Sequence, residues 1–266
     1  THKKLPKSFG RIGMCLNEKE YYNIPVGDLN KVCFILINDY KKEFRDLGVG
    51  PLNDGYLIGL THHRQGFKVF YLHNPQSEKF SSFLGFFIKN TTQALTVFYS
   101  GRGDNSQIEF TNVSLPKRSI TETISSHCNG EAHVVFISDC LNGGSAFDVH
   151  QCSNCISFSV QKTPSNEVQN TRRSHGVFTY YFCKIINECP NSISFSVQKT
   201  CENKEKNIKR FHGIFTYYFC KMISDSPSIT PKRLVERINP SIKRFDEFFT
   251  SEVSNKELLD SPLFFN

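Results

Sequence analysis

The fold of this chain is decided by two stretches, Phe98-Tyr99-Ser100-Gly101-Arg102-Gly103-Asp104 and Phe136-Ile137-Ser138-Asp139-Cys140-Leu141-Asn142-Gly143-Gly144. Each begins at the end of a short apolar, β-branched run, residues 94–99 and 133–138, and passes into small polar residues and glycines. Similar runs at 31–38, 67–72 and 156–160 alternate with segments of helical spacing. This alternation predicts an α/β fold with a mostly parallel central sheet and helices on both faces.

The run at 31–38 is continuously apolar, which is typical of a strand buried on both faces. Helices are predicted at Gly55–Gln65 and at Glu78–Asn90. In a sheet of this kind, functional groups lie at the carboxyl ends of the strands. Arg102 and Leu141 directly follow two such ends, so the candidate site is expected there.

The two loops resemble the catalytic loops of the caspase and metacaspase superfamily, the clan CD cysteine peptidases. In that family the first loop reads Tyr-Ser-Gly-His-Gly and the second Asp-Cys-Cys-His-Ser-Gly or a close variant, with the histidine as base and the second cysteine as nucleophile. Other stretches follow in the family's order, among them the Gly-Pro-Leu-Asn-Asp turn at 50–54, the strand at 156–160, the His-Gly-Val-Phe-Thr helix start at 175–179 and the closing stretch at 261–265. The resemblance implies a caspase-like three-layer sandwich over nearly the whole chain.

Both positions that carry the family's chemistry have changed. The histidine position holds Arg102 and the nucleophile position holds Leu141. Arginine stays protonated at physiological pH and cannot act as a base, and leucine has no nucleophilic atom. The resemblance therefore implies an inactive, degenerate metacaspase-like domain that acts by binding or regulation. Its expected partner is a protein or peptide, and an active caspase-like relative is one candidate.

Two alternatives remain open. The first is a cysteine endopeptidase with a rearranged site, selective for Arg or Lys, in which Cys140 attacks with help from a histidine such as His63 or His133. Neighbouring strand residues point to opposite faces, so Cys140 is expected to point into the sheet. The second is a structural interaction domain, or a decaying gene product, in which the site residues have no function.

The resemblance also implies which residues would remain for substrate binding. Asp54 and Asp139 match the acids that form the family's pocket for an Arg or Lys side chain, and Ser100 matches a pocket serine. Gly103 could still present a backbone N–H to an oxyanion. Asp139 could instead cap the end of its strand. Arg102 could form an ion pair with Asp139 or Asp104 and so block the pocket.

An internal duplication departs from the family pattern. Residues 152–188 and 189–225 align without a gap and share Ile-Ser-Phe-Ser-Val-Gln-Lys-Thr and a His-Gly-Val/Ile-Phe-Thr-Tyr-Tyr-Phe-Cys-Lys stretch. The duplication is either a recent genomic or gene-model event or an added strand and helix at the sheet edge. An added edge strand would obstruct a caspase-like dimer, so a monomer is expected. Copy one, which follows the second loop directly, is expected to occupy the family's core position.

Composition is consistent with one domain over residues 1–266, because 266 residues with 38% apolar content can bury a substantial core. The formal charge of +7 is spread along the chain without an aromatic-basic face, which argues against nucleic acid. The chain has no apolar run long enough for a membrane span, and its first residues lack the apolar core of a signal peptide. We expect no membrane association.

The ten cysteines give no clear metal or disulfide pattern. Cys152 and Cys155 have the Cys-x-x-Cys spacing of metal ligands, but no second close pair follows. The acids between Asn105 and Ser138, with Asp148 beyond the second loop, are too few and scattered for a calcium site. The sequence therefore predicts no metal, no cofactor, reduced cysteines and a cytoplasmic location.

Overall fold

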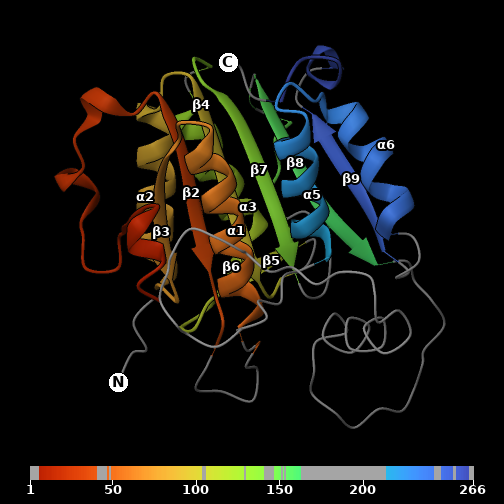
Figure 1. Ribbon diagram of the computed structural model, residues 1–266. Coiled ribbons are helices and arrows are strands. Elements are labelled where there is room, and N and C mark those ends of the chain that lie inside the picture. The colour runs from red at the N-terminus through yellow and green to blue at the C-terminus, as the bar shows by residue number, and fades with distance from the viewer. Residues whose placement is uncertain are drawn as a thin grey trace, which may run out of the picture.

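The computed structural model describes residues 6–40, 47, 49–103, 106–128, 130–140, 147–150, 152, 154–162, 214–242, 247–253 and 256–263. Within these residues a seven-stranded sheet has the order β1-β3-β2-β4-β7-β8-β9 (Figure 1). Its strands are β1 (Met14–Cys15), β2 (Lys31–Ile37), β3 (Lys68–His73), β4 (Ala94–Gly101), β7 (His133–Cys140), β8 (Cys155–Lys162) and β9 (Glu247–Val253). Neighbouring strands are parallel from β1 to β8, and β9 runs antiparallel to β8.

Helices cover both faces of this sheet. Figure 1 shows α1 (Gly50–Arg64), α5 (Ile214–Asp225) and α6 (Pro231–Ile242) in front of it, with α2 (Ser77–Asn90) and α3 (Lys117–His127) behind. A small antiparallel hairpin, β5 (Gln107–Glu109) and β6 (Ser114–Pro116), precedes α3. The α/β class with a mostly parallel sheet and helices on both faces, predicted from the sequence, is confirmed.

Each face of the sheet has its own apolar core. Alternate residues of β4 and β7, such as Phe98 and Ile137, pack with the helices of the α1/α5 face. Their sequence neighbours, such as Tyr99 and Phe136, pack with the phenylalanines of α2 on the other face. Burial on both sides explains why these strands read as continuous apolar runs. Side-chain alternation therefore decides which face a residue at a strand end reaches.

The predicted strands lie where the sequence places them, and α2 agrees with its prediction to within one residue. The start of α1 was predicted wrongly, because the helix begins at Gly50 and not at Gly55. Pro51 lies in the first turn, where a missing backbone N–H costs no helical hydrogen bond. Asp54 consequently projects from the helix itself and not from a turn before it. Among the described helices, none combines the length and apolar character needed to cross a bilayer.

The duplication contributes to the described fold in an unexpected way. β8 belongs to copy one, whereas α5, which packs on α1, belongs to copy two. The expectation that copy one fills the core position is thus confirmed for the strand and wrong for the helix. The strand sequence of copy two, 193–199, lies outside the described residues, and β9 occupies the edge of β8 that an added strand would need.

Candidate functional site

The carboxyl ends of β4 and β7 meet side by side, as the sequence predicts. Ser100 is the register partner of Asp139, and Gly101 is the partner of Cys140. Arg102 follows directly after β4. Leu141 lies outside the described residues. The two loops that carry the resemblance therefore begin next to one another.

Four residues form what we call the acidic cluster: Asp54, Ser100, Asp139 and Thr216. The Ser100 hydroxyl donates to Asp54 Oδ2 over 3.4 Å, and the Thr216 hydroxyl donates to Asp139 Oδ2 over 2.6 Å. Ser100 and Asp139 are adjacent across the strands, so the two pairs are neighbours. The cluster joins α1, β4, β7 and α5 on one face of the sheet.

Burial sets the electrostatics of this cluster. Asp54 is 5% exposed, and Asp139 is half-buried beneath α5. Burial raises the pKa of Asp139 above its ordinary value, and the hydrogen bond from Thr216 lowers it in part. An ionised carboxylate here lacks most of its hydration, so a cationic partner would stabilise it. Thr216, which the sequence did not single out, is a member of the site.

Cys140 lies on the opposite face from the acidic cluster. It is 6% exposed and packs with Tyr99 and Phe136 in the core of the α2 side. Its sulfur lies 3.0 Å from the Ser138 hydroxyl. A nucleophile is needed on the face where the substrate lies, and the side chain of Cys140 does not reach that face.

The two histidines considered as bases lie at the other end of the sheet. His133 is the first residue of β7, and the strand's 8 residues separate it from Cys140 by roughly 23 Å. His63 is in the last turn of α1, close in sequence to the start of β3.

The backbone of Arg102 rests on two buried tyrosines. Its N–H donates to the Tyr40 hydroxyl over 3.1 Å, and its carbonyl accepts a hydrogen bond from the Tyr99 hydroxyl. Burial raises the pKa of both phenols. Asp139 accepts a hydrogen bond from Thr216, and the ion pair between Arg102 and an acid that would block the pocket remains a prediction. Asp104, its other suggested partner, lies outside the described residues.

Gly103 is held tightly at the end of the loop. It forms an antiparallel bridge with Ile108, and a Cβ built on it would lie 2.8 Å from the Gln107 carbonyl oxygen and 3.3 Å from Cys140 Sγ. A side chain would clash with that carbonyl, so glycine is required here. The predicted oxyanion role of its N–H remains a prediction.

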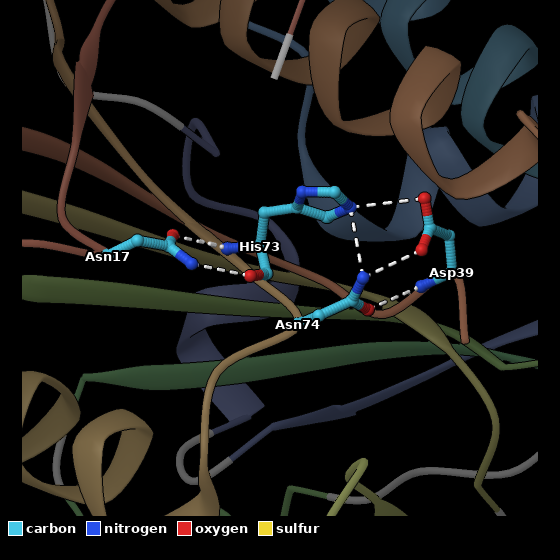
Figure 2. A network of polar contacts seen from close by, with 4 residues as sticks. All are labelled: Asn17, Asp39, His73 and Asn74. Carbon is cyan, nitrogen blue, oxygen red and sulfur yellow. Dashed lines mark hydrogen bonds and ion pairs between the residues drawn. The ribbon is translucent and has the colours of Figure 1, made fainter. Parts of the chain in front are cut away.

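A polar network that sequence reasoning missed lies at the ends of β2 and β3 (Figure 2). His73 Nε2 lies 3.1 Å from Asp39 Oδ2, and Asn74 Nδ2 donates to Asp39 Oδ1 over 2.7 Å. The Asn17 side-chain amide donates to the His73 carbonyl over 2.6 Å, and its oxygen accepts a hydrogen bond from the His73 backbone N–H over 2.9 Å. Asp39 is fully buried and His73 is 9% exposed. The network ties β1, β2 and β3 together.

His73 lies in the same register row across the sheet as Ser100 and Asp139 of the acidic cluster. In register, His73 pairs with Ile37, Ile37 with Ser100, and Ser100 with Asp139. Three strand spacings place His73 about 14 Å from Asp139. In the sequence, the signal for His73 was a polar residue at the end of a strand. Its contact with Asp39 could be found only from the three-dimensional structure.

Three cysteines come together at the amino ends of the strands. The sulfurs of Cys128, Cys152 and Cys155 all lie within 4.8 Å of one another. The hydrogen bond with Cys155 lowers the pKa of Cys152 to about 7 and raises the pKa of Cys155. Burial raises the pKa of Cys128. Sequence reasoning identified the Cys-x-x-Cys pair but not the third member.

The likeness of this chain to known proteins is a structural one. No protein-family model matches it, and no curated protein matches it. Among solved structures it is similar to the structure of pro-Sf-caspase-1, with 11% identity, 83% of each chain covered and a TM-score of 0.49. This likeness does not carry that protein's activity to this chain.

Proposed function

We propose that this chain is a caspase-like domain that binds a basic side chain of a protein or peptide partner without cleaving it. The observation that carries the proposal is the acidic cluster at the carboxyl ends of β4 and β7. Its two carboxylates, Asp54 and Asp139, lie on the face covered by α1 and α5. The partner is a protein or peptide, and an active caspase-like relative is a candidate.

The chemistry of the cluster favours a cation. Asp54 accepts a hydrogen bond from the Ser100 hydroxyl and Asp139 accepts one from the Thr216 hydroxyl, and both donors are neutral. Carboxylates that are removed from water are costly unless they are paired with a cation. The planar guanidinium of arginine donates two parallel hydrogen bonds to a carboxylate, which makes arginine the best-fitting partner.

Cleavage is disfavoured by the same geometry. The base position holds Arg102 and the nucleophile position holds Leu141. The neighbouring thiol, Cys140, is buried on the opposite face of the sheet. On the face of the acidic cluster, among the described residues, Cys220 of α5 interacts electrostatically with Asp54, but burial raises the pKa of its thiol to about 12 and so disfavours a thiolate. We infer that the domain works as a monomer, in which β9 forms the edge strand of the sheet.

The first experiment measures binding of fluorescent peptides by anisotropy. A peptide with a central arginine is compared with the same peptide carrying citrulline, which keeps the shape and removes the charge. We expect the arginine peptide to bind at least tenfold more tightly, which corresponds to about 1.4 kcal/mol. Equal affinities for the two peptides would contradict the proposal.

Matched variants locate the binding. Asp54→Asn and Asp139→Asn each keep the side-chain shape and remove one charge, so each should weaken arginine-peptide binding about tenfold or more. Glu122→Gln changes an exposed acid on α3, on the far side of the sheet, and should leave the affinity unchanged. Loss of affinity in Glu122→Gln as large as in Asp139→Asn would show nonspecific attraction.

Cleavage is tested separately with an arginine-directed probe that labels catalytic cysteines. We expect no labelling of the folded domain. Labelling at Cys140 that disappears on denaturation, and that Cys140→Ser abolishes, would identify a rearranged cysteine peptidase. That result would overturn the binding-only function.

A further inference from the structure

The cysteine group at the amino ends of the strands has the dimensions of a metal site. Cys128 directly follows α3, and Cys152 and Cys155 flank the turn that leads into β8. All three sulfurs lie within 4.8 Å of one another. Zinc bound to thiolates at about 2.3 Å in tetrahedral geometry holds its sulfurs about 3.8 Å apart. One ion therefore fits among them after small side-chain movements.

The turn between Cys152 and Cys155 is held in place by its own hydrogen bonds. The Cys152 N–H donates to the Val149 carbonyl over 3.1 Å. Asn154 has a φ of 60°, which asparagine tolerates better than most residues, and its side chain donates to the Gly130 carbonyl over 2.8 Å. The Val134 N–H donates to the Asn154 carbonyl over 2.9 Å. These bonds fix the turn against the loop that follows Cys128.

The surroundings suit a soft metal ion. Cys152 and Cys155 are buried and pack in the apolar core of the α2 face, whereas Cys128 is half-buried. Thiolate sulfur in an apolar setting selects zinc or copper(I) over magnesium or calcium. The partial exposure of Cys128 gives an ion a way in from solvent.

The duplication supplies an independent comparison. Copy one reads Cys152-Ser153-Asn154-Cys155, and the aligned residues of copy two read Cys189-Pro190-Asn191-Ser192. Copy two has therefore lost the second thiol, and Cys128 lies outside both copies. The copy whose strand stands next to β7 is the one that keeps both cysteines.

We propose that Cys128, Cys152 and Cys155 bind one thiophilic metal ion, zinc, through three thiolates. Water fills the fourth position of a tetrahedral zinc ion that has three protein ligands. The bound ion connects the end of α3 to the start of β8, on either side of β7. Binding stabilises the fold because the unfolded chain does not hold the three sulfurs together. This site is separate from the acidic cluster, which lies at the opposite ends of the strands.

The test uses the full chain, reduced and stripped of metal, titrated with cobalt(II) as a spectroscopic substitute for zinc. We expect one cobalt ion per chain, with thiolate-to-metal charge-transfer absorption and the visible bands of a tetrahedral site. Cys155→Ser, which introduces the residue that copy two carries, should remove this spectrum. Cys128→Ser should remove it as well. Cys15→Ser changes an exposed cysteine outside the group and should leave it unchanged.

A stability measurement gives a second readout. Zinc should raise the midpoint of thermal unfolding by roughly 5 °C or more in the unchanged chain and in Cys15→Ser, but not in Cys155→Ser. A cobalt spectrum that survives Cys155→Ser would overturn the proposal. A disulfide between two of the three cysteines, mapped in protein that was prepared without reductant and contains no zinc, would also overturn the proposal.

Discussion

The two ends of the parallel strands carry different titratable chemistry. At the carboxyl ends lie three carboxylates: those of Asp39 and Asp54 are buried, and that of Asp139 is half-buried. At the amino ends lie the three cysteines and two buried histidines: His62 in the last turn of α1, and His133 at the start of β7. The buried acids lie at the end of the sheet where the sequence predicts a binding site, together with His73 and Cys140. The amino ends hold the three-cysteine group and the other two buried histidines.

This difference predicts opposite responses to pH at the two ends. Burial lowers the pKa of His62 to about 4, so the folded chain resists taking up a proton that the unfolded chain accepts. Burial raises the pKa of Asp139, so the folded chain retains a proton that the unfolded chain releases. His62 therefore lowers the free energy of unfolding as the pH falls, and Asp139 lowers it as the pH rises.

The largest expected effect comes from breaking the network of Figure 2 at the carboxyl ends. Asp39→Ala leaves His73 and Asn74 without the buried carboxylate that both contact, and should lower the free energy of unfolding by about 3–5 kcal/mol. Denaturant unfolding followed by circular dichroism measures this loss. Asp28→Ala removes an exposed ion pair with Lys68 and should cost less than about 1 kcal/mol. Similar losses in both variants would show that burial of Asp39 does not matter.

The next largest effect tests the amino end. Between pH 6.5 and pH 4 the unfolded chain protonates at position 62 and the folded chain does not, so this residue alone lowers the free energy of unfolding by about 3 kcal/mol as the pH is lowered. His62→Leu should reduce this fall. His63→Leu changes the exposed neighbour on the same turn and should preserve it. The measurement is denaturant unfolding at several pH values across this range.

A smaller effect distinguishes the two repeat copies. Thr216→Val removes the hydroxyl that donates to Asp139 and should lower the free energy of unfolding by about 1 kcal/mol. Thr179→Val changes the aligned residue of copy one and should have no comparable effect. If Thr179→Val destabilises the chain and Thr216→Val does not, the helix of copy one donates to Asp139, and the assignment of copies is reversed.

The smallest effect concerns Asp139 itself. As pH rises from 3.8, the ordinary value for aspartate, towards the raised pKa of the folded chain, the unfolded chain loses its proton first. The free energy of unfolding therefore falls with rising pH in this window. Asp139→Asn cannot ionise, so its stability relative to the unchanged chain should be higher at pH 8 than at pH 4. A constant difference at both pH values would show that Asp139 is well solvated.

Much of the site at the carboxyl ends of the strands could be predicted from the sequence, because its residues directly follow apolar strand segments. Ser100, Arg102 and Asp139 occupy fixed places after apolar runs, and parallel register brings those places together. Asp54 was predicted as a turn residue and lies in a helix, because Pro51 allows α1 to begin early. The opposite directions of Asp139 and Cys140 also follow from strand alternation alone.

The sequence by itself determined the alternation of strands and helices, the strand ends that carry Ser100 and Asp139, and the presence of an arginine and a leucine at positions 102 and 141. Periodicity and residue identity are local properties, so they can be read along the chain. Only the tertiary structure decided that the helix of copy two supplies Thr216, that Asp39 meets His73, and that Cys128 joins Cys152 and Cys155. Each of these contacts joins segments far apart in sequence, and their meeting depends on how the strands and helices pack around a shared core.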